Sequence, residues 1–380
     1  MHGMITVPGT AQATMMANEL CSRKIGTRIL SPAPRRFFGA LAPEVALSFV
    51  PVPLGLISRI TGVRLGNNAG YLDSVIFDRL AAMRLSACDF VIGWAHVSLV
   101  TARRAKNLGA KFVLDRACPH VDFQQQLLEE EAEKVGHKFV RQPEWFIERQ
   151  YEEYQVADAI LVPSHYSKDS FPSPLRQKII VAPIFGRFRN QPFDGTPGGG
   201  KTFVVGVVGG EPLRKGYLYL LKAWKKLNLP NAVLRIRAAR GFSEFPVLRE
   251  LALECRNVEL VDYVQDMNEF YKACDLFILP SIDDGFGMAL FEAMSNGVPC
   301  IATTRCGSVE LLSHKADAYI IRPYDSEEIS SAIEYLYYNS EFRIRLGHSG
   351  RERVSGMRSG ATTYQYRKAF DQLLLKCGLH

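Results

Sequence analysis

The sequence lacks any pairing pattern among its cysteines. Its eight cysteines are scattered along 380 residues, with no CxxC and no spacing typical of a zinc site. Several of them, including Cys88, Cys274 and Cys300, lie in or beside apolar runs, where a free cysteine acts as a small core residue. The pattern argues against a disulfide scaffold and indicates a reducing compartment.

Long hydrophobic runs are also missing. Residues 45–57 are apolar, but Pro51, Pro53 and Gly55 interrupt them, so this run is too short and too broken to cross a bilayer. The first 16 residues show no charged region followed by an apolar core, and we expect no signal peptide. These absences predict a cytoplasmic protein, with peripheral contact to the inner membrane face left open.

Acidic residues are scarce in the first third of the chain. Up to Arg116 there are 14 Lys and Arg against 6 Asp and Glu, a balance of +8, whereas the whole chain carries +7. A basic first part suits an anionic partner such as a phosphorylated acceptor, an anionic lipid surface or nucleic acid. A solvated basic face without a partner explains the charge equally well. Nucleic acid is disfavoured, because no regular aromatic platform accompanies the basic residues.

What the sequence does contain is typical of a two-domain α/β protein. With 47% hydrophobic and 22% charged residues the chain is globular rather than disordered. Strand-length apolar runs alternate with helical stretches in both halves, which predicts two Rossmann-like domains with a cleft between them. We expect an N-terminal, acceptor-side domain over 1–185, a Gly- and Pro-rich linker over 186–200, a C-terminal nucleotide-sugar domain over 201–358 and a final helix over 359–380.

Residues 34–65 read as an irregular segment. Arg35 and Arg36 precede two phenylalanines, and the proline-broken apolar run follows. One interpretation is a mobile acceptor loop that leans on a membrane, since it mixes cationic and aromatic side chains. Ordinary loop packing is the alternative, and the residues alone favour it.

The stretch 280–299 is the one around which the chain is organised. It follows a short apolar run at 275–279, and its turn at 283–287 is rich in acid and glycine. A helix is predicted over 288–295, because the sequence Asn-Gly-Val-Pro that follows stops it. The result is a βαβ unit whose glycine loop lies at the carboxyl end of a strand, where open α/β sheets bind ligands.

Glu292 is the unusual residue of this helix, because its neighbours are apolar on all sides. A buried carboxylate is costly unless a donor binds it. The backbone N–H groups at the start of the helix make an anion site. N–H groups that can bind phosphate therefore lie within one turn of a carboxylate that can bind hydroxyls. A sugar nucleotide presents both phosphate and hydroxyl groups. A tight-packing glycine turn and a glutamate that caps backbone amides are the alternative.

The same stretch resembles the E-x7-E signature of family-4 retaining glycosyltransferases of the GT-B fold. Asp284 and Glu292 stand at the two acidic positions, and the match extends to residues 307–310. The resemblance implies that Glu292 binds the ribose of the donor and that Asp284 is catalytic, against the donor sugar. Asp284 is one methylene shorter than the usual glutamate. The donor contacts implied along the motif are Gly285, Phe286, Gly287, Met288, Ala289 and Glu292.

Three further positions carry the resemblance outside this motif. Lys215, with Arg214 beside it, matches the lysine of an "RKG" phrase that binds the donor diphosphate, whereas an earlier arginine position falls at Gly209 or Gly210, so that charge is missing. Gly9 lies in the loop expected over the cleft. His120 follows the predicted strand 111–115, where family members place a functional histidine. The residues alone do not favour His120 over His96.

The resemblance implies a retaining transfer of a hexosyl group from a UDP- or GDP-sugar to a glycan, glycolipid or small hydroxyl acceptor, as in polysaccharide biosynthesis. It implies no metal and no cofactor, and a terminal helix that crosses back to the first domain. A dinucleotide oxidoreductase is disfavoured, because no G-x-G-x-x-G follows the first strand. A catalytically silent GT-B scaffold that binds nucleotide or glycan stays open.

Overall fold

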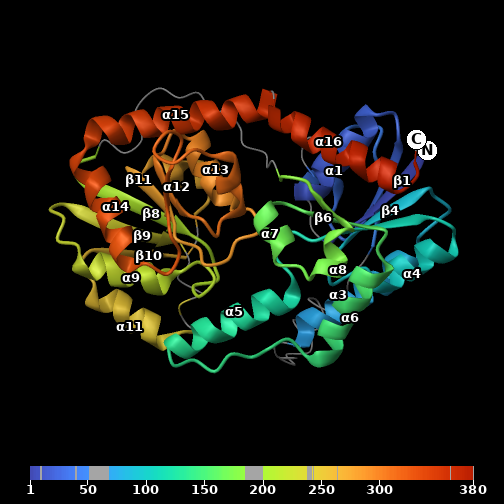
Figure 1. Ribbon diagram of the computed structural model, residues 1–380, viewed down its shortest axis with the longest axis horizontal. Helices are drawn as coiled ribbons and strands as arrows, with labels where there is room; N and C mark the ends of the chain where they lie inside the picture. Colours follow the sequence, from blue (N-terminus) through green and yellow to red (C-terminus); the bar gives the residue numbers. More distant parts are fainter. Residues whose placement is uncertain are drawn as a thin grey trace.

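Two parallel sheets, one after the other along the chain, organise the molecule (Figure 1). The computed structural model describes residues 1–8, 11–38, 41–50, 68–184, 200–237, 242, 244–262, 264–359 and 361–379. Gly9 and nearly all of the expected linker 186–200 lie outside these residues. Within them, no helix is long and apolar enough to cross a membrane.

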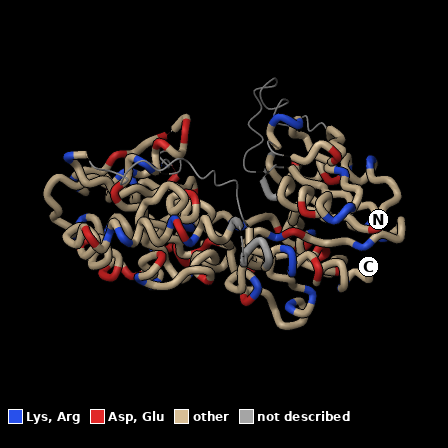
Figure 2. Tube along the Cα trace, turned by 90° about the horizontal axis from the view of Figure 1, so that it is seen from above, with Lys and Arg blue, Asp and Glu red and all other residues tan. Residues whose placement is uncertain are grey.

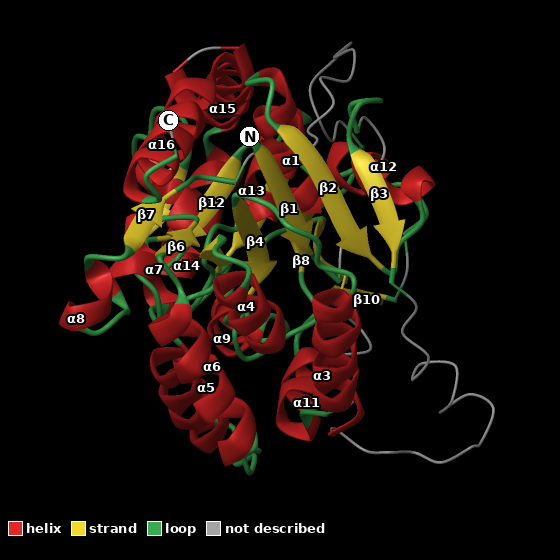
Figure 3. Ribbon diagram, turned by 90° about the vertical axis from the view of Figure 1, so that its right-hand side faces the viewer, coloured by secondary structure: helices red, strands yellow, loops and turns green. Residues whose placement is uncertain are grey.

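The first sheet has seven parallel strands in the order β3-β2-β1-β4-β5-β6-β7. Figure 3 shows β3, β2, β1 and β4 side by side. Parallel strands are covered on both faces and therefore read as continuous apolar runs, as in the fully buried Ala-Ile-Leu-Val of β6. The strands are β1 (His2–Thr6), β2 (Gly26–Ser31), β3 (Ala46–Phe49), β4 (Phe90–Trp94), β5 (Lys111–Asp115), β6 (Ala159–Val162) and β7 (Ile179–Val181).

Helices cover both faces of this sheet. One face packs against α1 (Ala11–Ser22) and the C-terminal helix α16 (Ala361–Lys376). The other packs against the following helices: α3 (Asn68–Met83), α4 (Leu99–Asn107), α6 (Glu144–Val156) and α8 (Ser173–Arg176). The short helices η1 (Arg35–Phe38) and α7 (His165–Asp169) also belong to this half.

The second sheet has six parallel strands in the order β10-β9-β8-β11-β12-β13. Alternate residues of β8 point to opposite faces, with Val205 and Val207 in one hydrophobic cluster and Val204 and Val208 in the other. The strands are β8 (Phe203–Val208), β9 (Ala232–Arg237), β10 (Val258–Val261), β11 (Leu276–Leu279), β12 (Cys300–Thr303) and β13 (Tyr319–Ile321).

Helices again lie on both faces of the second sheet. The first face packs against α9 (Tyr217–Lys226), α11 (Pro246–Glu254) and α14 (Ser326–Tyr338). The second packs against α12 (Met267–Lys272), α13 (Met288–Ser295) and α15 (Ser340–Ser359). The short helix η2 (Gly307–Leu311) follows β12. The prediction of two Rossmann-like sheets is confirmed.

The expectation that 34–65 is irregular throughout is wrong. Residues 46–49 form β3, the edge strand of the first sheet, paired in parallel with β2, and 35–38 form η1. The strand is only four residues long and the prolines nearby obscured it. Residues 39–40 and 51–67 lie outside the described part of the chain.

Two helices join the halves (Figure 1). α5 (Val121–Lys134) comes from the first half, yet its Leu127 and Ala132 lie in the core of the second sheet. α16 follows α15 and returns to the first half, where Arg23 binds Asp371 at 2.5 Å. The expected return of the last helix is therefore confirmed. Figure 2 shows the two signs of charge interspersed over both lobes.

Asp115, the last residue of β5, is a buried carboxylate beneath α1 and α16. Its side chain is 5% exposed, and no hydrogen-bond donor reaches its Oδ2 within the described residues. Met16 and Tyr366 line the same small cavity. Burial raises the pKa of Asp115 to about 7.

Asp115→Asn should therefore flatten the dependence of stability on pH. The unfolded carboxyl has a pKa of about 4, so between about pH 4 and pH 7 the folded protein holds one more proton than the unfolded chain. Stability falls as the pH rises through this window. We expect the melting temperature of the wild type, relative to that of Asp115→Asn, to drop across it. Parallel melting curves for the two proteins would contradict the assignment.

Candidate functional site

Two loops meet at the carboxyl ends of β8 and β11, which are neighbours in the middle of the second sheet. One loop covers residues 209–216 and the other 280–287. The carbonyl of Arg214 accepts the N–H of Ile282 at 3.0 Å, so the loops are joined through the backbone. This junction brings together the lysine, the arginine and the acids that the sequence singled out.

The side chains of Lys215 and Asp284 form an ion pair at the junction. Lys215 Nζ lies 2.5 Å from Asp284 Oδ2, and each side chain is 11% exposed. Burial raises the pKa of Asp284, but the charges of Lys215 and Arg214 and the N–H of Gly287 outweigh it and hold the pKa below its usual value. Asp284 is thus ionised at neutral pH.

Some of the polar groups near this ion pair already have partners within the protein. Arg214 binds Glu211 at 2.5 Å and donates to the carbonyl of Asp283 at 3.2 Å. The N–H of Gly287 is held by Asp284. Of the amides at the start of α13, those of Met288 and Ala289 therefore remain for an anion.

Glu292 lies one turn along α13 from Met288, on the same face. Most of the helix is buried, but Met288, Ala289 and Glu292 are half-exposed. The hydroxyl of Tyr271 on α12 donates to Glu292 Oε2 at 2.7 Å. A tyrosine thus orients this carboxylate, and among the described residues no backbone amide donates to it, as the alternative would require.

Gly285 is one of the points where the second half touches the first. A Cβ on Gly285 would lie 2.2 Å from the carbonyl oxygen of Ala117, so only glycine fits. The carbonyl of Gly285 accepts the hydroxyl of Ser164 at 2.7 Å. This motif glycine therefore serves the contact between the halves.

The start of α7 forms a second contact with the same region. Glu310 accepts the backbone N–H groups of His165 and Tyr166 at 2.8 and 2.6 Å, which is the capping position of a helix. The hydroxyl of Tyr166 also donates to Asp283 at 2.8 Å, and Gln124 of α5 donates to it at 2.7 Å. Glu310 and Asp283 are thus both hydrogen-bonded to residues of the first half.

His120 caps α5, with its Nδ1 accepting the N–H of Asp122 at 3.3 Å. The ring is 5% exposed and packs against Tyr154 and Phe171. Burial lowers its pKa to about 4, with Asp122 acting in the opposite direction, so the imidazole is neutral. Because Nδ1 accepts, Nε2 carries the proton.

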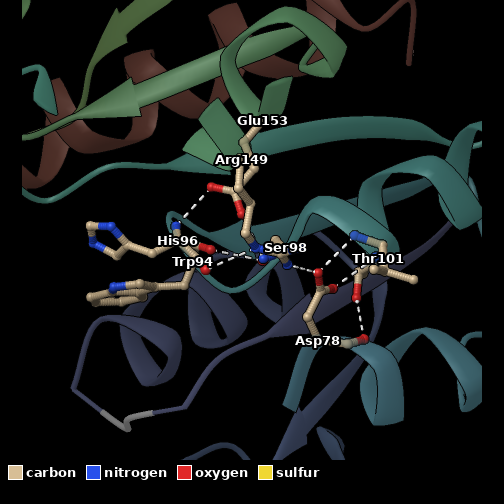
Figure 4. A network of polar contacts seen from close by, with 8 residues as sticks. Asp78, Trp94, His96, Ser98, Thr101, Arg149 and Glu153 are labelled. Atoms are coloured by element: carbon tan, nitrogen blue, oxygen red, sulfur yellow. Dashed lines mark hydrogen bonds and ion pairs between the residues drawn. The ribbon is translucent and has the colours of Figure 1, made fainter. Parts of the chain in front are cut away.

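A buried polar network holds the loop after β4 (Figure 4). Glu153 accepts the backbone N–H groups of His96 and Ser98 at 2.7 and 2.9 Å. Arg149 donates to the carbonyl of His96 and pairs with Asp78, which accepts two N–H groups at the start of α4. Burial raises the pKa of Glu153 to about 7 despite its two backbone donors.

His96 itself acts on the neighbouring loop 115–120. Its Nδ1 lies 3.0 Å from Gln150 Oε1 and 3.2 Å from Arg116 Nη1. Arg116 also donates to the carbonyl of Pro119 at 2.8 and 3.0 Å. Burial lowers the pKa of His96 to about 3, with the charge of Arg116 adding to the effect. The sequence alone did not favour His120 over His96 as a functional residue. In the structure both histidines belong to or contact the loop 115–120.

Several residues of the site escaped the sequence reasoning. Tyr271 reaches the motif from α12, and Tyr166, Gln124 and Ser164 reach it from the first half. A serine two residues after β6 signals a helix cap, but nothing local signals a partner in the second half. Within the described residues, no group of three or more His, Cys, Asp or Glu is placed to hold a metal.

Comparison with known sequences matches the second half to a family. Residues 193–353 match the model described as "Glycosyl transferases group 1". The chain is 27% identical over 180 residues to the capsular polysaccharide biosynthesis glycosyltransferase CapM of Staphylococcus aureus, covering 46% of this chain and 47% of that protein. It is 26% identical over 167 residues to mannosylfructose-phosphate synthase of Agrobacterium fabrum, covering 40% and 37%. The chain thus spans less than half the length of these relatives.

Solved structures match over the whole chain. Sucrose-phosphate synthase from Thermosynechococcus elongatus superposes with a TM-score of 0.71 at 15% identity, covering 98% of this chain and 99% of that one. Anabaena HepE in complex with UDP-glucose gives 0.68 at 16% identity, again covering 98% and 99%. Identity at this level shows the fold, and the predicted GT-B fold is confirmed.

Gly285→Ala should loosen the contact between the two halves. The added methyl meets a backbone carbonyl, which cannot move aside as a side chain does, and overpacking of this kind costs about 1–3 kcal/mol. We expect a lower melting temperature and a larger radius of gyration by small-angle scattering.

Gly210→Ala is the matched control, because a Cβ there meets nothing within 4 Å. If Gly285→Ala behaves like this control in both measurements, the close approach to Ala117 does not hold the halves together.

Proposed function

We propose that this chain, which has the GT-B fold and whose residues 193–353 match the group 1 glycosyltransferases, transfers a sugar from a nucleotide diphosphate sugar to a hydroxyl acceptor. The observation that carries the proposal is the arrangement around α13. A half-exposed carboxylate, Glu292, stands one turn from the free amides of the helix start, beside the buried pair Lys215–Asp284. In the proposed complex Glu292 binds the ribose hydroxyls, the amides bind the diphosphate, and the pair Lys215–Asp284 lies beside the diphosphate and the sugar.

The proposed donor is held mainly by charge. Lys215 has three N–H donors and Asp284 uses one, which leaves donors for the diphosphate. The amides of Met288 and Ala289 add the positive end of α13. Fixed donors of this kind stabilise a leaving diphosphate without reorganisation in the transition state, so we propose transfer without a metal ion. The proposed donor carries uracil or guanine as its base.

The proposed sugar site lies between Asp284 and the loop 115–120. Asp284, ionised and paired with Lys215, precedes Gly285, which touches Ala117 of this loop. Burial raises the pKa of Cys118 in the same loop, and the charge of Asp284 helps to raise it. His120, neutral with its proton on Nε2, would donate to a sugar hydroxyl rather than act as an acid. Retention rests on the motif alone, and the anomeric configuration of the product tests it.

The acceptor proposed is a glycan, a glycolipid or a small hydroxyl compound, bound by the first half. Phe37 and Phe49 are each 57% exposed, and Arg36 lies over the Phe37 ring at 5.2 Å, which supports peripheral contact with an anionic membrane. Arg35, in contrast, is used inside the fold, since it donates to the carbonyl of Val45 at 2.9 Å.

One observation favours a second candidate, a GT-B protein that binds nucleotide without transferring sugar. The charge of Lys215 is already neutralised by Asp284, and Gly209 and Gly210 carry no charge where the family has an arginine. Nucleotide binding without turnover on any acceptor would favour this candidate over the enzyme.

A panel of UDP- and GDP-sugars, incubated with the protein in excess EDTA, tests the proposed function. We expect release of nucleoside diphosphate by slow hydrolysis, and faster release when a hydroxyl acceptor is present. Strict dependence on added manganese would contradict the metal-free proposal. Absence of both hydrolysis and nucleotide binding would contradict the donor site itself.

Glu292→Gln is the informative variant in that assay, because it keeps the shape and an acceptor for Tyr271 but removes the charge. A charge-assisted hydrogen bond contributes about 1.5–3 kcal/mol, so we expect donor affinity to fall about tenfold or more. The melting temperature should hold. A loss of melting temperature with unchanged UDP and GDP affinity would make Glu292 a structural residue.

A further inference from the structure

The carboxyl edge of the second sheet carries an arginine that the site described above does not use. Arg237 is the last residue of β9 and lies opposite Val208, the last residue of β8. The N–H of Gly209 reaches the carbonyl of Arg237 at 3.3 Å. Arg237 is therefore beside the loop 209–216, at the edge where the proposed donor binds.

The side chain of Arg237 leaves the sheet on the face that α13 covers. Val233, four residues earlier on β9, lies in the same hydrophobic cluster as Tyr271 and the buried residues of α13. Because side chains alternate along a strand, residues 233, 235 and 237 share a face. Arg237 therefore stands on the same side of the sheet as Glu292.

The guanidinium of Arg237 is incompletely satisfied. Its Nε is buried, and within the described residues no acceptor lies within hydrogen-bond distance of it and no acid pairs with it. The residue as a whole is only half-buried, so it lies near the surface of the protein. A buried donor without an acceptor costs free energy, which a ligand that supplies the acceptor recovers.

The neighbouring cations differ from Arg237 in this respect. Arg235, on the same strand and face, pairs with Glu259 at 2.7 Å. Lys215 pairs with Asp284, and Arg214 pairs with Glu211, each at 2.5 Å. Arg237 also lies within electrostatic reach of Tyr217, whose pKa burial raises and the arginine charge lowers, and the hydroxyl of Tyr217 donates to the carbonyl of Gly209.

We propose that Arg237 binds the diphosphate of the nucleotide donor. It supplies from β9 the positive charge that the uncharged Gly209 and Gly210 of the adjacent loop do not supply. The inference rests on the proposed function, because the diphosphate is the one that the loops 209–216 and 280–287 would hold. The recognised chemistry is a nucleoside diphosphate, and the contact is a charge-assisted hydrogen bond from the guanidinium to phosphate oxygen.

The test compares Arg237→Gln with Arg235→Gln, a matched control that removes an arginine already paired with an acid. Binding of UDP and GDP is measured by calorimetry, with uridine and guanosine as probes that lack phosphate. We expect Arg237→Gln to weaken nucleoside diphosphate binding about tenfold. Nucleoside binding should not change, and Arg235→Gln should match the wild type. The melting temperature of Arg237→Gln without ligand should hold or rise, because an unsatisfied buried donor is removed.

Gly210→Arg in the Arg237→Gln background completes the test. A Cβ at Gly210 meets nothing within 4 Å, so the loop has room for the side chain. We expect the double variant to recover part of the lost UDP or GDP affinity, and a double variant no tighter than Arg237→Gln counts against the inference.

Equal diphosphate affinity in Arg237→Gln and the wild type overturns the role of Arg237 and leaves the proposed function standing. An equal loss of nucleoside and diphosphate affinity also overturns it, because the arginine would then act through the fold. A wild type that binds neither UDP nor GDP contradicts the proposed function, and this inference fails with it.

Discussion

The contact between Gly285 and the backbone of Ala117 fixes how the two halves of the protein face each other. At this point the glycine loop of the second half meets the loop after β5 of the first, with no room for a side chain. Ser164 and Glu310 reinforce the contact through backbone groups on either side. The segment that would hold the donor is therefore also the segment that holds the first half in place, and the two tasks share one loop.

Charge is distributed around that loop so that each acid has a partner. Asp284 is balanced by Lys215, and Asp283 by the hydroxyl of Tyr166 and the amide of Gln124. A buried ion pair adds little net stability, because desolvation offsets the attraction. Its value lies in geometry, because it keeps Asp284 ionised and leaves further Lys215 donors for the proposed diphosphate. Arg237, which has no acid partner within the described residues, is the further cation that we propose for the same anion.

The sequence predicted what local signals encode. Apolar runs, glycine turns and stop signals indicated both parallel sheets, and the predicted helix 288–295 is α13 as found. Other features depend on contacts between residues that are far apart in the sequence. β3 was missed because four residues at a sheet edge carry a weak signal. The helix α5 was predicted, but its packing on the second sheet was not, because a charged helix does not reveal which core it joins. The partners of Asp283 lie 117 and 159 residues away, so only the folded chain brings them together.

If one loop both binds the donor, as proposed, and joins the halves, donor binding should also change the first half. Hydrogen–deuterium exchange with and without UDP or GDP tests it most directly, with the matching nucleoside as control. The account predicts slower exchange at 284–292 and also at α7 in the opposite half, where Glu310 holds the helix start. Protection confined to the second half, with α7 unchanged at saturating nucleotide, would contradict it.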